Sequence, residues 1–340
     1  MALALLHSPA EWVARFGANR PRAALTVGNF DGIHLGHQRI LRRVVERARA
    51  TGAMAAAVTF DPHPLKILRP AEAPCLIATL AQRLEGLDRL GLDAVLVLKF
   101  DAELARLSAE EFVRGILLEQ LRMTAILVGE NFRFGHRQSG DVRLLAELGH
   151  ARDFGVEMVP PVVVRGEVVS SSAIRRAVSE GRMSCATRLL GGPFALSGEV
   201  QRGSGRGGSI VFPTLNLAAE QELLPARGVY ATETLVGSQW YRSATNVGVR
   251  PTFDGGSISV ESHLLSFSES ITSGRLKVRF WRRLREERKF SGPDALRVQI
   301  ARDLARTRRF FERLDRWQAQ RVVGPESGGP RRPRTRPQTV

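Results

Sequence analysis

Residues 25–41 read LTVGNFDGIHLGHQRIL, and this stretch decides the fold class more than any other in the 340-residue chain. A β-like run ends at Phe30, and a turn then brings His34 and His37 to the start of an amphipathic helix. Histidines three residues apart share one face of a helix, and the free N–H groups at a helix start attract anions. The stretch therefore predicts a phosphate site, although an isolated His-x-x-His also occurs as a pair of solvated helix histidines.

The residues around the histidines favour the phosphate interpretation. Gly28, Gly32 and Gly36 let the backbone approach a ligand closely. Asp31 belongs to a residue type that caps helices, so we expect it to cap the helix after His34.

The first part of the chain, from residue 23 to about residue 164, alternates apolar runs with segments of helical periodicity. The expected strands lie at residues 23–30, 55–60, 93–100, 124–129 and 156–164. The expected helices follow His34 and cover residues 80–90, 108–121 and 141–154. This alternation predicts an α/β fold with a Rossmann-like parallel sheet, in which ligands bind at the carboxyl ends of the strands.

From about residue 192 the sequence pattern changes to short β-like runs separated by Gly, Ser and Pro. Six runs, at residues 194–203, 211–218, 228–237, 239–251, 257–267 and 275–284, predict a small antiparallel barrel. A helix over residues 292–314, with Leu296, Ile300, Leu304 and Phe311 on one face, is expected to close it. We therefore expect domains at residues 1–190 and 191–320, followed by a disordered basic tail at residues 321–340 that is rich in Pro, Gly and Arg.

The composition limits the classes of function. A hydrophobic fraction of 43% is ordinary for a globular protein, and no apolar run reaches the roughly 20 residues that span a bilayer. The N-terminal apolar run has no basic residue before it, which argues against a secretory signal and for a cytoplasmic location. Cys75 and Cys185 lack the spacing of a disulfide framework or metal finger, so we expect two core thiols.

The net charge of +16 raises the question of nucleic-acid binding. The sequence contains no RNP-type strand, zinc-finger spacing or convincing helix-turn-helix, and only 6% of its residues are aromatic. We therefore expect no specific nucleic-acid partner and no membrane partner, while the oligomeric state is unknown from the sequence.

The motif His34-Leu35-Gly36-His37, within the longer string TVGNFDGIHLGH, resembles the HxGH signature of nucleotidyltransferases and in particular bacterial FAD synthetase. The resemblance extends from about residue 25 to residue 311. It implies an N-terminal FMN adenylyltransferase and a C-terminal riboflavin kinase. The resemblance also implies ATP, riboflavin and FMN as substrates, FMN and FAD as products, and Mg²⁺ as the cofactor bound with ATP.

The resemblance implies an adenylyl-transfer site made from two strings. In the first, His34 and His37 would contact the ATP phosphates, and the nucleotide pocket would include Gly28, Phe30, Asp31 and Gly36. In the second, SSSAIRR at residues 170–176, the contacts would come from Ser170, Ser171, Ser172 and the cationic fork of Arg175. The family usually has SSTxIR, so Ser172 keeps the hydroxyl; alone, three serines are more often a simple helix cap.

Two further strings resemble the flavin side of this module. TFDPHP at residues 59–64 supplies Asp61 and His63, and GENFRFGHRQSGD at residues 129–141 supplies Asn131, Arg133 and two aromatic rings. Taken singly, either string is equally well a plain loop.

The second half of the chain has no Walker A sequence. GSGRGG at residues 203–208 matches GxGxxG, but β-like sequence follows it where a dinucleotide-binding motif would open a helix. Gly203 and Gly205 instead lie in a loop that resembles the ATP loop of riboflavin kinases. In the neighbouring PTLN string, Thr214 and Asn216 would hold Mg²⁺ and phosphate, although PTLN alone is an ordinary turn.

Glu261 matches the family glutamate that takes a proton from the ribityl 5′-hydroxyl, while a solvated strand glutamate is the alternative. Arg250, in NVGVRPTF just upstream, is assigned to flavin contact by the same resemblance. The chain departs from the common kinase pattern at Gly208, Val211, Leu215 and Ser266. Two hypotheses follow: a bifunctional enzyme that makes FMN and then FAD, and a monofunctional FMN adenylyltransferase with an inactive flavin-binding barrel. A third, a nucleic-acid-binding regulator, rests on charge alone.

Overall fold

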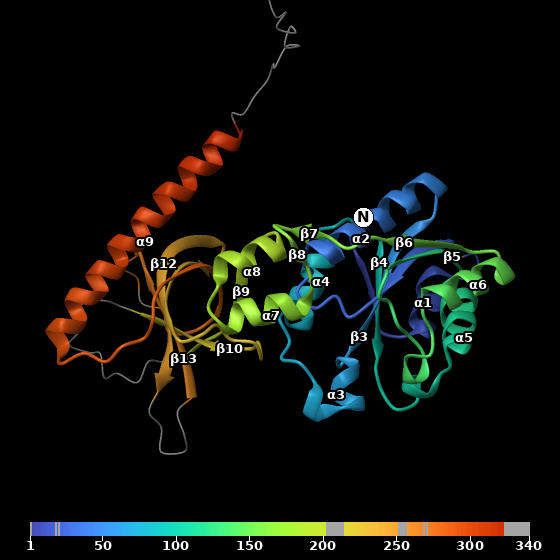
Figure 1. Cartoon of the computed structure of the whole chain (residues 1–340), viewed down its shortest axis with the longest axis horizontal. Helices are drawn as coiled ribbons and strands as arrows, with labels where there is room; N and C mark the ends of the chain where they lie inside the picture. Colours follow the sequence, from blue (N-terminus) through green and yellow to red (C-terminus); the bar gives the residue numbers. More distant parts are fainter. Residues whose placement is uncertain are drawn as a thin grey trace, which may run out of the picture.

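The chain folds into two modules joined by a pair of helices (Figure 1). The structure is a computed structural model that describes residues 2–17, 19, 21–201, 214–250, 257–267, 269 and 271–322. Figure 1 shows a barrel on the left, a parallel-sheet module on the right, and α7 and α8 between them.

The first module contains a six-stranded sheet in the order β1–β4–β3–β2–β5–β6, with every neighbouring pair parallel. The strands are β1 (Ala4–Leu6), β2 (Ala23–Val27), β3 (Met54–Asp61), β4 (Ala94–Lys99), β5 (Met123–Gly129) and β6 (Gly155–Val159). The helices are α1 (Pro9–Phe16), α2 (Leu35–Thr51), α3 (Pro64–Leu68), α4 (Leu80–Asp88), α5 (Ala109–Glu111), the π-helix η3 (Phe112–Gln120) and α6 (Val142–Arg152), with short 3₁₀ turns η1 (Pro70–Glu72), η2 (Leu104–Arg106) and η4 (His136–Gln138).

Helices cover both faces of this sheet. Leu25 and Val27 of β2 pack in one core cluster with Trp12 of α1, whereas Ala24 packs in another cluster with Leu41 of α2. All five residues of β2 are buried, because alternate side chains enter opposite cores. The predicted parallel α/β fold is confirmed.

Two parts of this module differ from the expectation. β1 and α1 were not anticipated; β1 pairs with β4 and adds an edge strand. The run expected as one strand at residues 156–164 is divided between β6 and β7 (Val163–Val164), which forms a hairpin with β8 (Glu167–Val168). Pro160 and Pro161 explain the break, because proline has no N–H to donate to a strand ladder.

The second module is a closed barrel in the order β10–β13–β12–β11–β14–β9, in which all neighbouring strands are antiparallel. The strands are β9 (Phe194–Gln201), β10 (Leu215–Ala219), β11 (Gly228–Val236), β12 (Gln239–Arg250), β13 (Ser257–Leu264) and β14 (Arg275–Arg285). Each of the six predicted runs contributes one strand, so the predicted barrel is confirmed.

The helices α7 (Ser171–Ser179) and α8 (Met183–Leu190) lead into the barrel, and their buried side chains share a core cluster with it. The expected domain boundary at residues 190 and 191 falls between α8 and β9 and stays a prediction.

Helix α9 (Pro293–Val322) packs on the barrel through Leu304 and Phe311, as the one-face pattern predicts. Asp303 of this helix is buried and pairs with Arg285 of β14 at 2.8 Å. The helix continues beyond the expected end at residue 314, and residues 321 and 322, which we expected in the tail, are helical. The remainder of the predicted tail, residues 323–340, lies outside the described residues.

The core-thiol prediction is wrong for Cys75, whereas Cys185 packs against the core cluster of α7, α8 and the barrel. Cys75 is exposed in the loop before α4, and Cys185 of α8 is half-buried; both are free. Within the described part of the chain, no helix has the length and apolar character needed to cross a membrane.

Candidate active sites

The two histidines stand at the N-terminus of α2, directly after the strand at the centre of the sheet. His34 is the N-cap residue, and its Nδ1 accepts a hydrogen bond from the backbone N–H of His37 at 3.3 Å. The two rings stack with centroids 3.7 Å apart, and the ring of Phe30 meets His37 edge-on at 5.4 Å. The histidines therefore share one face, as their spacing predicts.

Both histidines are uncharged near neutral pH. Burial, together with the positive charge of Arg175, lowers the pKa of His34 to about 4, against the opposing effect of its backbone hydrogen bond. Burial, and then the neighbouring His34, lowers the pKa of His37 well below its ordinary value. Because Nδ1 of His34 accepts a bond, the neutral ring carries its proton on Nε2 and can donate it to an anion.

His37 carries a polar ring atom whose hydrogen-bonding capacity is not satisfied among the described residues. Its Nδ1 is buried and has no hydrogen-bond partner among the described residues. Buried polar atoms are normally satisfied, so this orphan atom fits a site that a ligand completes.

The glycines next to these rings are required by close packing. A Cβ on Gly36 would lie 3.1 Å from Cε1 and Nδ1 of His34, and one on Gly28 would lie 3.1 Å from the ring of Phe30. The glycines therefore make room for the aromatic rings as well as for a ligand.

Asp31 does not cap α2, and that prediction is wrong because the side chain of His34 takes the cap position. The carboxylate of Asp31 is 3% exposed and accepts bonds from the backbone N–H groups of Ile77 and Ala78, at 3.0–3.1 Å. It also pairs with Nη2 of Arg175 at 2.7 Å. Asp31 thus joins the two strings that the sequence separates by 144 residues.

The serine string lies beside the histidine string. Ser170 caps α7 by accepting a bond from the N–H of Ala173 at 3.2 Å, and Ser171 Oγ donates to the backbone carbonyl of Asp31 at 3.2 Å. Ser172 is exposed in the first turn of α7. Ser170 therefore has the helix-cap role that the sequence left open, while Ser171 joins the serine string directly to the histidine string.

The predicted flavin residues Asp61 and His63 lie where β3 ends. Asp61 pairs with the buried guanidinium of Arg83 at 3.2 Å. His63 caps α3 by accepting from the N–H of Leu65 at 3.2 Å, and its Nε2 is 3.0 Å from the side-chain amide of Asn29. Sequence reasoning missed Arg83, because an arginine in a helical segment normally indicates a solvated face.

Asn131 and Arg133 follow β5, so they lie at the same edge of the parallel sheet as His34 and Asp61. Both are exposed, and Arg133 pairs with Asp141 at 2.7 Å. Of the two aromatic rings in this string, Phe134 is 8% exposed and belongs to the core cluster, stacked on Phe132 at 5.3 Å. Phe134 therefore contributes to packing of the core, and a contact of either ring with flavin stays a prediction.

The barrel brings a second set of polar residues together. Asn216 of β10 is opposite Glu261 of β13, which is opposite Asn246 of β12. Asn216 is buried and Glu261 half-buried, and Thr214, directly before β10, is exposed. Register partners on antiparallel strands point to the same side of a sheet, so Asn216, Glu261 and Asn246 form one lateral row.

Several predicted kinase residues lie outside the described part of the structure. These are Gly203 and Gly205 of the glycine loop, together with Gly208 and Val211. The backbone of Arg250 ends β12, and its side chain is outside the described atoms.

A stacked histidine pair at the start of the helix after a central parallel strand, tied to a serine-arginine string, defines a nucleotidyltransferase-type module, here joined to a barrel. Over 288 residues, 84% of this chain and 92% of the relative, the chain is 35% identical to a bifunctional riboflavin kinase/FMN adenylyltransferase of Escherichia coli. The chain belongs to the family of bifunctional riboflavin kinase/FMN adenylyltransferases.

Comparisons with family models, a second relative and a solved structure give matches over the same two modules. Residues 17–173 match the FAD synthetase family and residues 190–311 match the riboflavin kinase family. A relative of the same name from Pseudomonas fluorescens is 38% identical over 284 residues, 83% of this chain and 91% of the relative. A crystal structure described as a macrolide-efflux protein from Streptococcus pneumoniae is 29% identical with a TM-score of 0.79, and the match covers 91% of this chain and 99% of that one. The monofunctional hypothesis is not favoured, because both families match.

Proposed function

We propose that the two reactions of this bifunctional enzyme take place at separate sites, with His34, His37 and Arg175 serving adenylyl transfer and Glu261 serving the kinase. The chain phosphorylates riboflavin to FMN with ATP, and then transfers an adenylyl group from ATP to FMN, giving FAD and pyrophosphate. The observation that carries the division is that each set of polar residues gathers on a different module.

Adenylyl transfer requires clamped phosphates, an ordered nucleophile and stabilisation of the charge on the leaving pyrophosphate. Nε2–H of His34 and the free N–H groups of the α2 start supply donors, and Arg175 adds a cationic fork. Asp31 orients Arg175 through the 2.7 Å pair, and the serine hydroxyls lie beside it. Gly28, Phe30 and Gly36 complete the nucleotide pocket.

FMN is assigned to the carboxyl edge of the sheet, next to the same histidines. Asp61 is the last residue of β3, and His63, Asn131 and Arg133 follow strand ends at the same edge. The exposed guanidinium of Arg133 can donate to the FMN phosphate, whose oxygen attacks the α-phosphorus of ATP as pyrophosphate leaves.

At the barrel, Glu261 accepts the proton of the ribityl 5′-hydroxyl while the γ-phosphoryl group transfers to that oxygen. Thr214 and Asn216 are assigned to Mg²⁺ and phosphate, and Gly203, Gly205 and Arg250 to ATP and flavin. Among the described residues no three His, Cys, Asp or Glu side chains gather to hold a metal, but Thr and Asn oxygens beside a carboxylate are hard donors that suit Mg²⁺ bound with phosphate. When bound, Mg²⁺ would neutralise phosphate charge.

Dependence on ATP favours a cytoplasmic location, and the arginine-rich surface suits anionic substrates without a specific nucleic-acid partner. Both remain predictions.

The division is tested with Glu261→Gln and His34→Ala variants of the full chain. We expect Glu261→Gln to lose phosphorylation of riboflavin while it still converts FMN to FAD, and His34→Ala to show the reverse. Folded variants that each lose both reactions equally would refute the division.

A further inference from the structure

Residues 75–78, which we call the strap, connect the adenylyl-transfer site to the barrel. On the side of the parallel-sheet module, the carbonyl of Cys75 accepts a bond from Nε of Arg175 at 2.8 Å. The N–H groups of Ile77 and Ala78 donate to the carboxylate of Asp31 at 3.0–3.1 Å. The strap therefore contacts both members of the Asp31–Arg175 pair.

The remaining strap residue, Leu76, is held by the barrel through both of its backbone polar groups. Its N–H donates to Oε2 of Glu222 at 3.1 Å, and its carbonyl accepts from the N–H of Leu223 at 3.3 Å. Glu222 and Leu223 lie in the loop between β10 and β11. One four-residue segment is thus fixed by hydrogen bonds from two modules.

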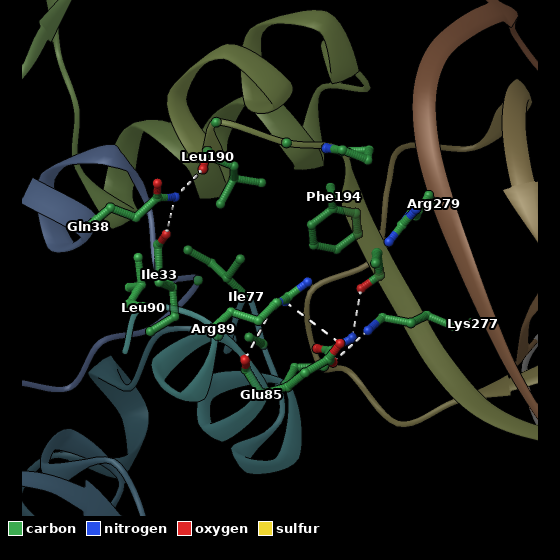
Figure 2. A pocket seen from close by; sticks show the side chains of 18 residues that line it. Ile33, Gln38, Ile77, Glu85, Arg89, Leu90, Leu190, Phe194, Lys277 and Arg279 are labelled. Carbon is green, nitrogen blue, oxygen red and sulfur yellow. Dashed lines mark hydrogen bonds and ion pairs between the residues drawn. The ribbon is translucent and has the colours of Figure 1, made fainter. Parts of the chain in front are cut away.

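The side chain of Ile77 strengthens this connection. It is 3% exposed and packs in the core cluster that contains Leu223 and the barrel interior. Figure 2 shows Ile77 on the wall of a pocket between α4 and the barrel. Across the same pocket, Glu85 of α4 pairs with Lys277 of β14 at 2.6 Å.

The loop that carries Glu222 is itself anchored to the barrel. The N–H of Ser197 on β9 donates to the side chain of Gln221 at 2.9 Å, and the N–H of Glu220 donates to the carbonyl of Ser197 at 2.9 Å. The other carboxylate oxygen of Glu222 pairs with Lys66, two residues after the start of α3. Partial burial acts to raise the pKa of the Glu222 carboxyl group, but the hydrogen bonds from Lys66 and from the Leu76 amide together lower it by more. The pKa of Glu222 therefore lies below its ordinary value, and the side chain is a charged carboxylate.

We propose that Glu222, a residue of the kinase module, is a positioning residue for adenylyl transfer. It acts through the strap: its carboxylate fixes the Leu76 amide, the next two amides hold Asp31, and Asp31 orients Arg175 toward the ATP phosphates. The inference rests on the proposed role of Arg175. It implies that the barrel supports the chemistry of the other module.

The test compares Glu222→Ala, Glu222→Gln and Glu220→Ala in the full chain. Glu220 is the matched control, because it lies in the same loop and pairs with Arg275 at 2.8 Å instead of the strap. For each variant, FAD formation from FMN gives kcat and the KM for ATP, and phosphorylation of riboflavin in the same preparation reports on the barrel.

We expect Glu222→Ala to raise the KM for ATP in FAD formation about 10-fold, since a hydrogen bond to a charged group contributes about 1.5 kcal/mol or more. Riboflavin phosphorylation should be unchanged. Glu222→Gln keeps an acceptor oxygen for Leu76 and should stay within about threefold of the wild type. Lys66→Ala removes only a partly exposed ion pair and should change the KM by less than about threefold.

Wild-type adenylyl transfer in Glu222→Ala, or an equal loss of both reactions, would overturn the proposal. A parallel Arg175→Ala variant distinguishes a failure of the role proposed for Arg175 from a failure of the positioning role proposed for Glu222. If Arg175→Ala kept full FAD formation, the proposed function of Arg175 would be wrong; if it lost FAD formation while Glu222→Ala kept it, only the positioning role would be wrong.

Discussion

Replacing Gly36 by alanine tests whether adenylyl transfer depends on the position of the His34 ring. The new Cβ would lie 3.1 Å from two atoms of that ring, a distance at which the neighbour must move by a few tenths of an ångström. Such a shift would disturb the 3.7 Å ring stack and the 3.3 Å hydrogen bond that the backbone N–H of His37 donates to Nδ1 of His34.

The magnitude follows from the displacement. A misplacement of 1 Å in a catalytic group costs about 100-fold in rate, so a few tenths of an ångström should lower kcat for FAD formation about 5- to 10-fold. The stability should not fall in parallel, because alanine in a helix is favoured over glycine by up to about 1 kcal/mol, which offsets the contact.

The assay is the rate of FAD formation from FMN and ATP, with riboflavin phosphorylation and denaturant unfolding measured on the same protein. Gly115→Ala is the matched control, because it is also a helical glycine and a Cβ there would meet no atom within 4 Å. An unchanged rate of FAD formation in Gly36→Ala, or the same rate loss in Gly115→Ala, would refute the reasoning.

Three further predictions concern pH, the buried ion pair and the barrel. Because the pKa of His34 is about 4 when folded and about 6.5 when unfolded, the unfolded chain takes up the proton first on acidification. The wild type should therefore lose about 3 kcal/mol of stability as the pH falls from about 6.5 to about 4, whereas His34→Gln should lose less; equal slopes in denaturant unfolding would contradict this. Asp31→Asn removes the charge that faces Arg175 and should lower the free energy of unfolding by about 2–4 kcal/mol and raise the KM for ATP, and kinetics like the wild type would show that the pair is dispensable. Gly198→Ala would place a Cβ 1.7 Å from the carbonyl oxygen of Ala218, so β9 should separate from β10 and the kinase reaction should be lost, as circular dichroism and riboflavin turnover would show; a fully active, equally stable variant would contradict the barrel register.

Local patterns predicted most of the fold, because the information lies within a few residues. The parallel strands are continuous apolar runs, and each barrel strand is bounded by turn residues. β1 escaped prediction because three residues, Ala4–Leu6, are too few to show a period. The start of α1 did have a signal, since Ser8 caps it and Pro9 occupies its first turn.

The site was only partly predictable, because its key contacts join distant parts of the chain. The histidine string and the serine string could be identified separately, but nothing local showed that Asp31 binds Arg175 instead of capping α2. The contact from Asp31 to Ile77 spans 46 residues and depends on a loop that no periodic pattern describes. Cys75 was misplaced for the same reason, since its exposure follows from the path of that loop.

The most direct test of the whole account is chromatography of flavins after incubating the purified protein with riboflavin, ATP and Mg²⁺, beside a reaction that starts from FMN. We expect riboflavin to give FMN and then FAD, and FMN to give FAD. FAD from FMN without any product from riboflavin would contradict the two-reaction enzyme, because it would mean that the barrel is not an active kinase.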